Sequence, residues 1–234
     1  MLNTAVAESL SLFYKELKGV SKAKLDEAVH KLLQKTIKEH RRVIFNGNGY
    51  TDEWVKEAKK RGLYNLKSTP EVLPTFLAKK NVKLFTKHGI FTETEIKSRY
   101  EILLENYTKT IHIEALTLRD MIYHDFMPAA VKYMESLTDE VTKKKAISAK
   151  ISTKTEETLL ERVSKKYEEL FKLTEKLEKD IAKAEAMTDE LKKAEFYHDP
   201  VFTDMQGIRA VADFIESYIP DEMLPYPTYS KILF

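Results

Sequence analysis

The chain has 234 residues, enough for one large domain or two small ones, and 32% of them are charged. Its 39 Lys and Arg nearly balance its 37 Asp and Glu, and the resulting net charge of +2 lacks the basic excess that is usual in nucleic-acid-binding proteins. No cysteine is present, which excludes disulfides, thiolate zinc sites and cysteine nucleophiles.

The start of the chain predicts three helices. Apolar residues at steps of three and four predict a first helix, with its buried face made of Leu2, Val6, Leu10, Phe13 and Leu17. Gly19 ends this helix, because glycine commonly follows a helix C-terminus. Ser21 caps a second helix, whose predicted buried face is made of Leu25, Val29, Leu32, Leu33 and Ile37. After an Asn-Gly-Asn-Gly loop at residues 46–49, Thr51 or Asp52 caps a short third helix.

A long helix is predicted to begin at a capping box made by Thr92 and Glu95, in which each side chain satisfies the free backbone N–H of the other. Its buried face is predicted to contain Ile96, Tyr100, Leu103, Tyr107, Ile111, Leu118 and Ile122. Pro128 is expected to kink or interrupt this helix, because proline lacks the backbone N–H and clashes with the preceding turn.

The most regular pattern runs from Thr155 to Glu195 and predicts one helix with a heptad seam. The seam consists of Leu160, Val163, Tyr167, Leu170, Thr174, Leu177, Ile181, Ala184, Thr188 and Leu191. It can associate within the chain or between chains. We favour pairing within the chain, against the helix that begins at Thr92, because that apolar partner lies just upstream. Asp199-Pro200 then ends the helix, and a last helix follows.

These elements predict an all-α fold, a helical bundle that divides into residues 1–90 and residues 91–234. The C-terminal tail from Leu224 is rich in proline and aromatic residues, and we expect it to lie as an extended strap against a helical surface. No stretch of about 18 apolar residues, the length of a spanning helix, occurs, and no basic leader precedes an apolar run. The expected location is therefore the cytoplasm, with no membrane partner.

Candidate chemistry is sparse. No histidine occurs in a specific metal-ligand spacing, and no GxxxxGK[ST] phosphate-binding loop is present. His124 and His198 are each followed by Asp, and surface or capping roles are favoured for both, because neighbours on a helix point in different directions.

Weak candidates for binding an anion are Arg41, Arg42, Asn46, Gly47, Asn48 and Gly49. Backbone N–H groups of this loop could face an anion at the start of the following helix. We favour the competing interpretation, a tight turn that needs positive φ at its glycines.

Several segments resemble the C-terminal part of a type III glutamine synthetase, in order along essentially the whole chain. They are residues 2–10 (LNTAVAESL), 39–55 (EHRRVIFNGNGYTDEWV), 63–74 (LYNLKSTPEVLP), 90–102, 113–116 and 225–229 (PYPTY). The segment at 39–55 resembles the type III subfamily in particular, while residues 138–195 match mainly in helical character.

This resemblance implies an enzyme that joins ammonia to glutamate with ATP and Mg or Mn. The active-site residues of that family lie in domains that would precede Met1, so no catalytic, cofactor-binding or metal-binding residue maps onto this chain. We therefore expect a non-catalytic fragment that packs against the catalytic domain of the same enzyme and supports assembly of a homo-oligomer. Two alternatives stay open, a stand-alone coiled-coil adaptor and a regulatory module that binds an anion at residues 41–49.

Overall fold

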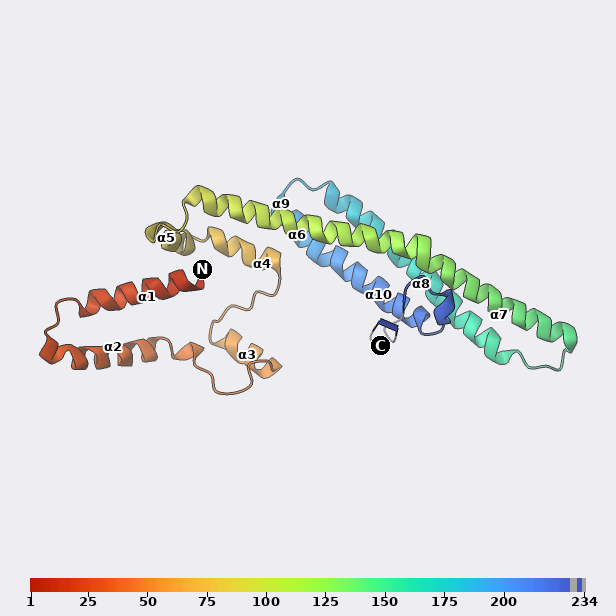
Figure 1. Ribbon diagram of the computed structural model, residues 1–234, viewed down its shortest axis with the longest axis horizontal. Coiled ribbons are helices and arrows are strands. Elements are labelled where there is room, and N and C mark those ends of the chain that lie inside the picture. Colours follow the sequence, from red (N-terminus) through yellow and green to blue (C-terminus); the bar gives the residue numbers. More distant parts are fainter. Residues whose placement is uncertain (228–230, 233–234) are drawn as a thin grey trace. The chain divides into compact units, whose positions relative to one another are not determined.

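In the computed structural model, residues 1–227 and 231–232 are described, and every regular element among them is a helix (Figure 1). The predicted all-α fold is confirmed. The chain divides into two compact units, Met1–Ile102 and Leu103–Phe234, which we call unit 1 and unit 2. The division into residues 1–90 and 91–234, which the sequence suggested, stays a prediction.

Unit 1 is built from short helices. They are α1 (Leu2–Leu17), α2 (Leu25–Glu39), α3 (Asp52–Lys60), α4 (Thr69–Val72), α5 (Lys79–Lys87) and the start of α6 (Glu93–Met121), with 3-10 turns at Lys22–Lys24, Arg41–Val43 and Leu73–Leu77. Gly19 follows α1 with a φ of 91°, as predicted for a residue that ends a helix. The predicted capping box of α6 also forms, with Thr92 N–H 2.7 Å from Glu95 Oε2 and Glu95 N–H 3.2 Å from Thr92 Oγ1.

Two local predictions about caps have different outcomes. Thr51 caps α3, because its hydroxyl accepts a hydrogen bond from the backbone N–H of Trp54 at 3.4 Å. Ser21 does not cap α2: it makes no capping hydrogen bond, and a 3-10 turn separates it from the first residue of α2, Leu25. The chain thus enters α2 through an extra turn that the sequence pattern did not indicate.

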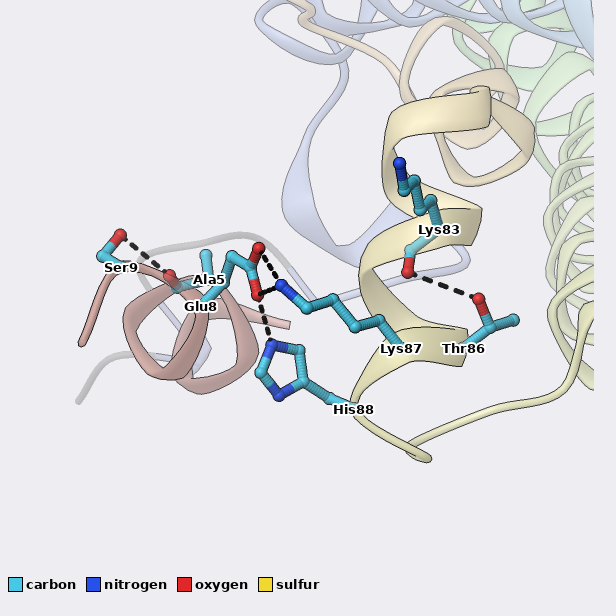
Figure 2. Close-up of polar contacts among 7 residues, drawn as sticks. All are labelled: Ala5, Glu8, Ser9, Lys83, Thr86, Lys87 and His88. Carbon is cyan, nitrogen blue, oxygen red and sulfur yellow. Dashed lines mark hydrogen bonds and ion pairs between the residues drawn. The ribbon is translucent and has the colours of Figure 1, made fainter. Parts of the chain in front are cut away.

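Unit 1 has a thin core. Its buried residues are Thr4, Leu32, Ser68, Pro70, Leu73, Phe85 and Ile96. A polar contact holds α1 to α5, where the Glu8 carboxylate lies 2.5 Å from Lys87 Nζ and 2.7 Å from His88 Nε2 (Figure 2). The hydrogen bond from Lys87, and then that from His88, lowers the pKa of Glu8.

Unit 2 is a bundle with one extended core. Its helices are the rest of α6, α7 (Met127–Ile147), α8 (Lys154–Glu185), α9 (Glu190–Phe196) and α10 (Phe202–Glu216), with π turns η4 at Ile122–Phe126 and η5 at Tyr197–Val201 and a short 3-10 turn η6 at Asp221–Met223. α8 packs against both α7 and α10, and the three lie side by side (Figure 1). The core between them includes Ile122, Phe126, Ala130, Val163, Leu170, Leu177, Tyr197, Val201, Ile208 and Ile215.

Pro128 does not end the long helix. It lies in the first turn of α7, directly after η4, so the helix passes from α6 to α7 through a wider turn. A π turn already leaves the α-helical bonding pattern, and this accommodates a residue that has no N–H to donate. Pro200 lies in η5, where Asp199 leaves the helical conformation with φ −154° and ψ 108°.

The prediction of one helix from Thr155 to Glu195 is wrong in its second half. α8 ends at Glu185, and α9 begins at Glu190 after a short break. The side chain of Asp189 accepts a hydrogen bond from Lys192 N–H at 3.0 Å and so provides a new helix start. Thr188 is exposed within the break, and Leu191 is half-buried on α9, although both continue the heptad spacing.

The remaining seam is buried inside unit 2. Val163, Leu170 and Leu177 have no exposed surface, and Ile181 is 4% exposed. Leu160 and Tyr167 are partly buried against the same core. The α6–α7 helix supplies one partner, as the sequence indicates, whereas the second partner, α10, was not predicted.

The described start of the C-terminal tail contacts unit 2. Leu224 packs against the core, and the Tyr226 hydroxyl donates a hydrogen bond to the carboxylate of Asp125 in η4. Burial and the Asp125 carboxylate raise the pKa of Tyr226 to about 12. Residues 228–230 and 233–234, which complete the predicted strap, lie outside the described residues.

Candidate functional site

The first helix buries part of its polar side and leaves the first half of its apolar side exposed. Thr4 is buried, and Glu8 and Ser11, at positions i+4 and i+7 from it, are half-buried on the same side of α1. The opposite side carries Leu2, Val6 and Leu10, which are 78%, 51% and 60% exposed. We call these three residues the open face of α1. The sequence predicted one apolar face made of these three residues with Phe13 and Leu17; within unit 1, Phe13 and Leu17 are half-buried, whereas Leu2, Val6 and Leu10 stay exposed.

The helix α2 shows the same feature in part. Leu32, on its predicted buried face, is 7% exposed, but Leu33 and Ile37 are 49% and 57% exposed. Amphipathic helices normally turn their apolar side to a core. Unit 1 therefore presents apolar helix surface that its own residues do not cover.

A basic pocket lies where α2 ends. It has a volume of about 540 Å³ and is lined by Ile37, Lys38, Arg41, Arg42, Ile44, Asn46 and Arg61. These seven residues include four cationic side chains and no carboxylate.

Arg61 is held in place at this pocket. Its Nε donates to Glu57 Oε1 at 2.8 Å, and its Nη1 donates to the carbonyl oxygen of Ile44 at 2.9 Å. The hydrogen bond from Arg61 lowers the pKa of Glu57. The guanidinium also lies 5.5 Å from the ring centroid of Trp54, which stacks on Phe45 at 4.0 Å. Arg61 was missed in the sequence, although its spacing of four from Glu57 on a helix was a signal of this ion pair.

Of the six predicted anion-binding candidates, Arg41, Arg42 and Asn46 line the pocket, whereas Gly47, Asn48 and Gly49 are not among its lining residues. The favoured interpretation of the loop, a turn with positive φ, is wrong, because positive φ among the described glycines occurs at Gly19, Gly62 and Gly89. The Asn48 side chain shapes the loop instead by accepting the N–H of Tyr50 at 3.0 Å. A Cβ on Gly47 would lie 2.7 Å from Cζ of Phe45, so close ring packing requires glycine there.

A second group of lysines lines a cavity of about 700 Å³ beside α5, together with Glu8. There the Glu8 carboxylate already pairs with Lys87 (Figure 2). This cavity thus has a carboxylate among its lining residues, whereas the basic pocket has none, and Glu57, which pairs with Arg61, lies outside the lining.

Unit 2 contains two partly buried pairs of tyrosine and histidine. Tyr197 Oη lies 2.8 Å from His112 Nδ1, and Tyr107 Oη lies 3.3 Å from His198 Nδ1, so both pairs join α6 to η5. Burial raises the pKa of Tyr197 to about 12. His124 is exposed, with Nδ1 3.1 Å from the carbonyl oxygen of Asp120.

Two buried carboxyl groups, Asp180 on α8 and Asp204 on α10, both lie beside Lys176. Burial raises the pKa of Asp204, and Asp204 Oδ2 has no hydrogen-bond partner among the described atoms. Hydrogen bonds from Lys183 and Lys176 outweigh burial at Asp180 and lower its pKa. The two groups therefore titrate as a pair.

Within residues 1–227 and 231–232, no three His, Asp or Glu side chains are grouped so that they could hold a metal ion. In the same part of the chain, no helix is long and apolar enough to cross a membrane.

Comparison with known proteins gives consistent matches. Residues 28–145, from α2 nearly to the end of α7, match the family model described as the glutamine synthetase C-terminal domain. A glutamine synthetase of Butyrivibrio fibrisolvens is 46% identical over 219 residues, which are 94% of this chain and 31% of that protein. A type-3 glutamine synthetase of Dictyostelium discoideum is 34% identical over all of this chain and 32% of its own length. A glutamine synthetase of Bacteroides fragilis is 28% identical, again over all of this chain and 33% of its own length. The chain thus spans about a third of the length of these relatives.

Proposed function

The chain belongs to the glutamine synthetase family, through its C-terminal domain, and from this we propose that its helices pack against the catalytic part of the same enzyme and support the assembly of its subunits. The observation that carries this proposal is the orientation of α1, which turns Leu2, Val6 and Leu10 away from unit 1. An apolar helix face of this kind is stabilised when another surface covers it.

The proposed occupant of this face is the remainder of the enzyme's own chain. The relatives are about three times as long as the segment they share with this chain, so they contain further polypeptide that could supply the covering surface. A leucine or valine side chain contributes roughly 1.5–3 kcal/mol when it passes from full exposure to full burial. Three such side chains would therefore contribute several kcal/mol to docking.

We propose that the whole enzyme joins ammonia to glutamate with ATP and Mg²⁺ or Mn²⁺. The described residues offer no cluster of metal ligands, and we assign no step of that reaction to them. The role of this chain in catalysis is instead to complete and hold the folded enzyme.

For assembly, we assign contacts between subunits to exposed surfaces and not to the heptad seam. The central seam residues, Val163, Leu170 and Leu177, are already buried against α7 and α10. A seam that is used within one chain has no surface left to offer to a second copy.

The test uses the Butyrivibrio fibrisolvens relative. Its polypeptide without the 31% that matches this chain is produced together with the 234-residue chain, and glutamine formation and co-elution on a sizing column are measured. We expect a complex that forms glutamine. The double variant Val6→Asp/Leu10→Asp should abolish the complex, because two buried charges without partners cost several kcal/mol.

Leu12→Asp is the matched control, since Leu12 is 48% exposed on the same helix but lies off the open face. It should retain the complex. Equal loss with both variants, or co-elution that Val6→Asp/Leu10→Asp leaves unchanged, would contradict docking through this face.

A further inference from the structure

We propose that the basic pocket at the end of α2 binds a small oxyanion that carries two or more negative charges, such as a phosphate ester or a dicarboxylate. This inference concerns a different surface from the open face and does not rest on the proposed function. Its first support is the lining: Lys38, Arg41, Arg42 and Arg61 converge on one cavity without a carboxylate among the lining residues.

The charges at this pocket are available to a ligand. In the part of the chain that the structure describes, Lys38, Arg41 and Arg42 take part in no ion pair, whereas Lys31 and Lys35 on the same α2 pair with Glu27 and Glu16. Three like charges around one cavity repel each other until a counter-ion neutralises them. An anion bound between them therefore lowers the electrostatic free energy of the folded chain.

The wall of the pocket is pre-organised. Arg61 is fixed by Glu57 and by the carbonyl oxygen of Ile44, and it lies against Trp54. These contacts settle the course of the backbone from residue 42 to residue 44, and that backbone carries Arg42. A ligand that enters such a site loses less affinity to the ordering of side chains.

The chemistry of the lining defines the ligand. Guanidinium groups present paired N–H donors that match phosphate and carboxylate oxygens, and the Asn46 amide adds a further donor. Ile37 and Ile44 supply apolar wall, which suits a ligand with a carbon skeleton behind its charged end. The volume of about 540 Å³ lies in the range of small-molecule sites and exceeds what a single inorganic ion fills.

The experiment uses the one tryptophan of the chain, Trp54, as a local reporter. Because the Arg61 guanidinium lies against the Trp54 ring, an anion that binds to this guanidinium should change the tryptophan emission. The 234-residue chain is titrated at constant ionic strength with pyrophosphate, with succinate and with a poly-glutamate peptide. We expect a saturable change with pyrophosphate or with succinate, and the stronger of the two assigns the ligand to phosphates or to carboxylates.

The variant Arg41→Gln/Arg42→Gln should weaken this binding about tenfold or more, since the loss of even one hydrogen bond between charged groups corresponds to about a factor of ten in affinity. Arg162→Gln on α8 is the control for the loss of an arginine, as it removes one guanidinium from an exposed position of unit 2, and it should bind as the natural chain does. If the double variant loses its helical circular dichroism, Lys38→Gln in the exposed last turn of α2 replaces it, with a weakening of a few-fold expected.

Three results would overturn the proposal. The first is a response that does not saturate with either small anion. The second is equal affinity in the natural chain and in the folded pocket variant. The third is a response to poly-glutamate alone, which would assign the pocket to a contact with an acidic protein segment.

Discussion

The two units differ in how far they bury the apolar face of an amphipathic helix. In unit 2, the apolar spacing of α8 is buried completely at Val163, Leu170 and Leu177, between two helices of the same chain. In unit 1, the first three residues of a similar apolar spacing on α1, Leu2, Val6 and Leu10, remain exposed, while Thr4 on its polar side is buried. Periodicity thus identifies the apolar side of a helix, but it does not say whether residues of the same unit bury that side.

The largest expected difference between the units is in stability. Leu170→Ala or Leu177→Ala should each lower the free energy of unfolding by about 2–5 kcal/mol, because each leaves a cavity in the packed core of unit 2. Leu10→Ala on the open face should change it by less than about 0.5 kcal/mol. Urea denaturation followed by circular dichroism measures all three, and similar losses in both units would remove the contrast.

Gly47 gives an exception within unit 1, because it lies in a closely packed site. Gly47→Ala should cost about 1 kcal/mol and alter the tryptophan emission, since the new Cβ meets the Phe45 ring that stacks on Trp54. Gly49→Ala is the control, because the nearest atom to its new Cβ, in Trp54, is 4.0 Å away. Thermal melts with fluorescence detection compare the two, and an unperturbed Gly47→Ala would show that the loop can relax.

A charge effect should distinguish the core of unit 2. Burial raises the pKa of Asp204, so the stability that its protonated form contributes is lost as the pH rises through the folded-state pKa. Asp204→Asn keeps the protonated shape and should be more stable than the natural chain by about 1 kcal/mol at neutral pH. The stability difference between the two chains should vanish in acid, where Asp204 of the natural chain is protonated in both the folded and the unfolded state.

Melting temperatures from pH 3 to pH 8 measure this effect. Asp213→Asn is its control, because Asp213 pairs with Arg209 at the surface of α10. An advantage of Asp204→Asn that does not change with pH would mean that Asp204 is ionised throughout.

The smallest expected effect concerns the attachment of α1. Glu8→Gln removes the charge that Lys87 and His88 contact, so the amide hydrogens of α1 should exchange faster than those of α2 (Figure 2). The pKa of Glu8 is lowered in the folded chain, so its contribution is present above its ordinary pKa and is lost as the pH falls through the folded value. Hydrogen exchange at two pH values measures both effects. Glu27→Gln, which breaks an exposed pair with Lys31 inside α2, should leave α1 unchanged.

Much of the fold was predictable because its signals are local. Thr51, Gly19 and the Thr92–Glu95 capping box act through hydrogen bonds or backbone conformations within a few residues of themselves. The heptad seam was predictable as far as Ala184, because the spacing and the partner helix lie in one chain.

The predictions fail where a neighbouring residue offers an alternative helix start, or where a contact between residues far apart in the sequence determines the structure. The Asp189 side chain caps a new helix, α9. The heptad spacing continues to Leu191, so the spacing does not indicate the break between α8 and α9. Arg61 lines the basic pocket together with Arg41, which lies 20 residues earlier in the sequence. No local spacing around Arg41 predicts that these two residues meet. The open face follows a clear periodicity, yet Leu2, Val6 and Leu10 are exposed within unit 1, and the spacing alone does not show this.

The π turn η4 accommodates Pro128, and it also sets the rotation of α7 relative to α6. Such a turn contains one residue more than an α-helical turn, so it offsets the phase of the helix that follows. Phe126 and Met127, which are neighbours in sequence, are both buried there. Deletion of one residue between Ile122 and Phe126 would rotate α7 by about 100° relative to α6 and turn Ala130 and Tyr133 away from α8. The length of this five-residue segment therefore sets the rotational register in which the two halves of the long helix meet the rest of unit 2.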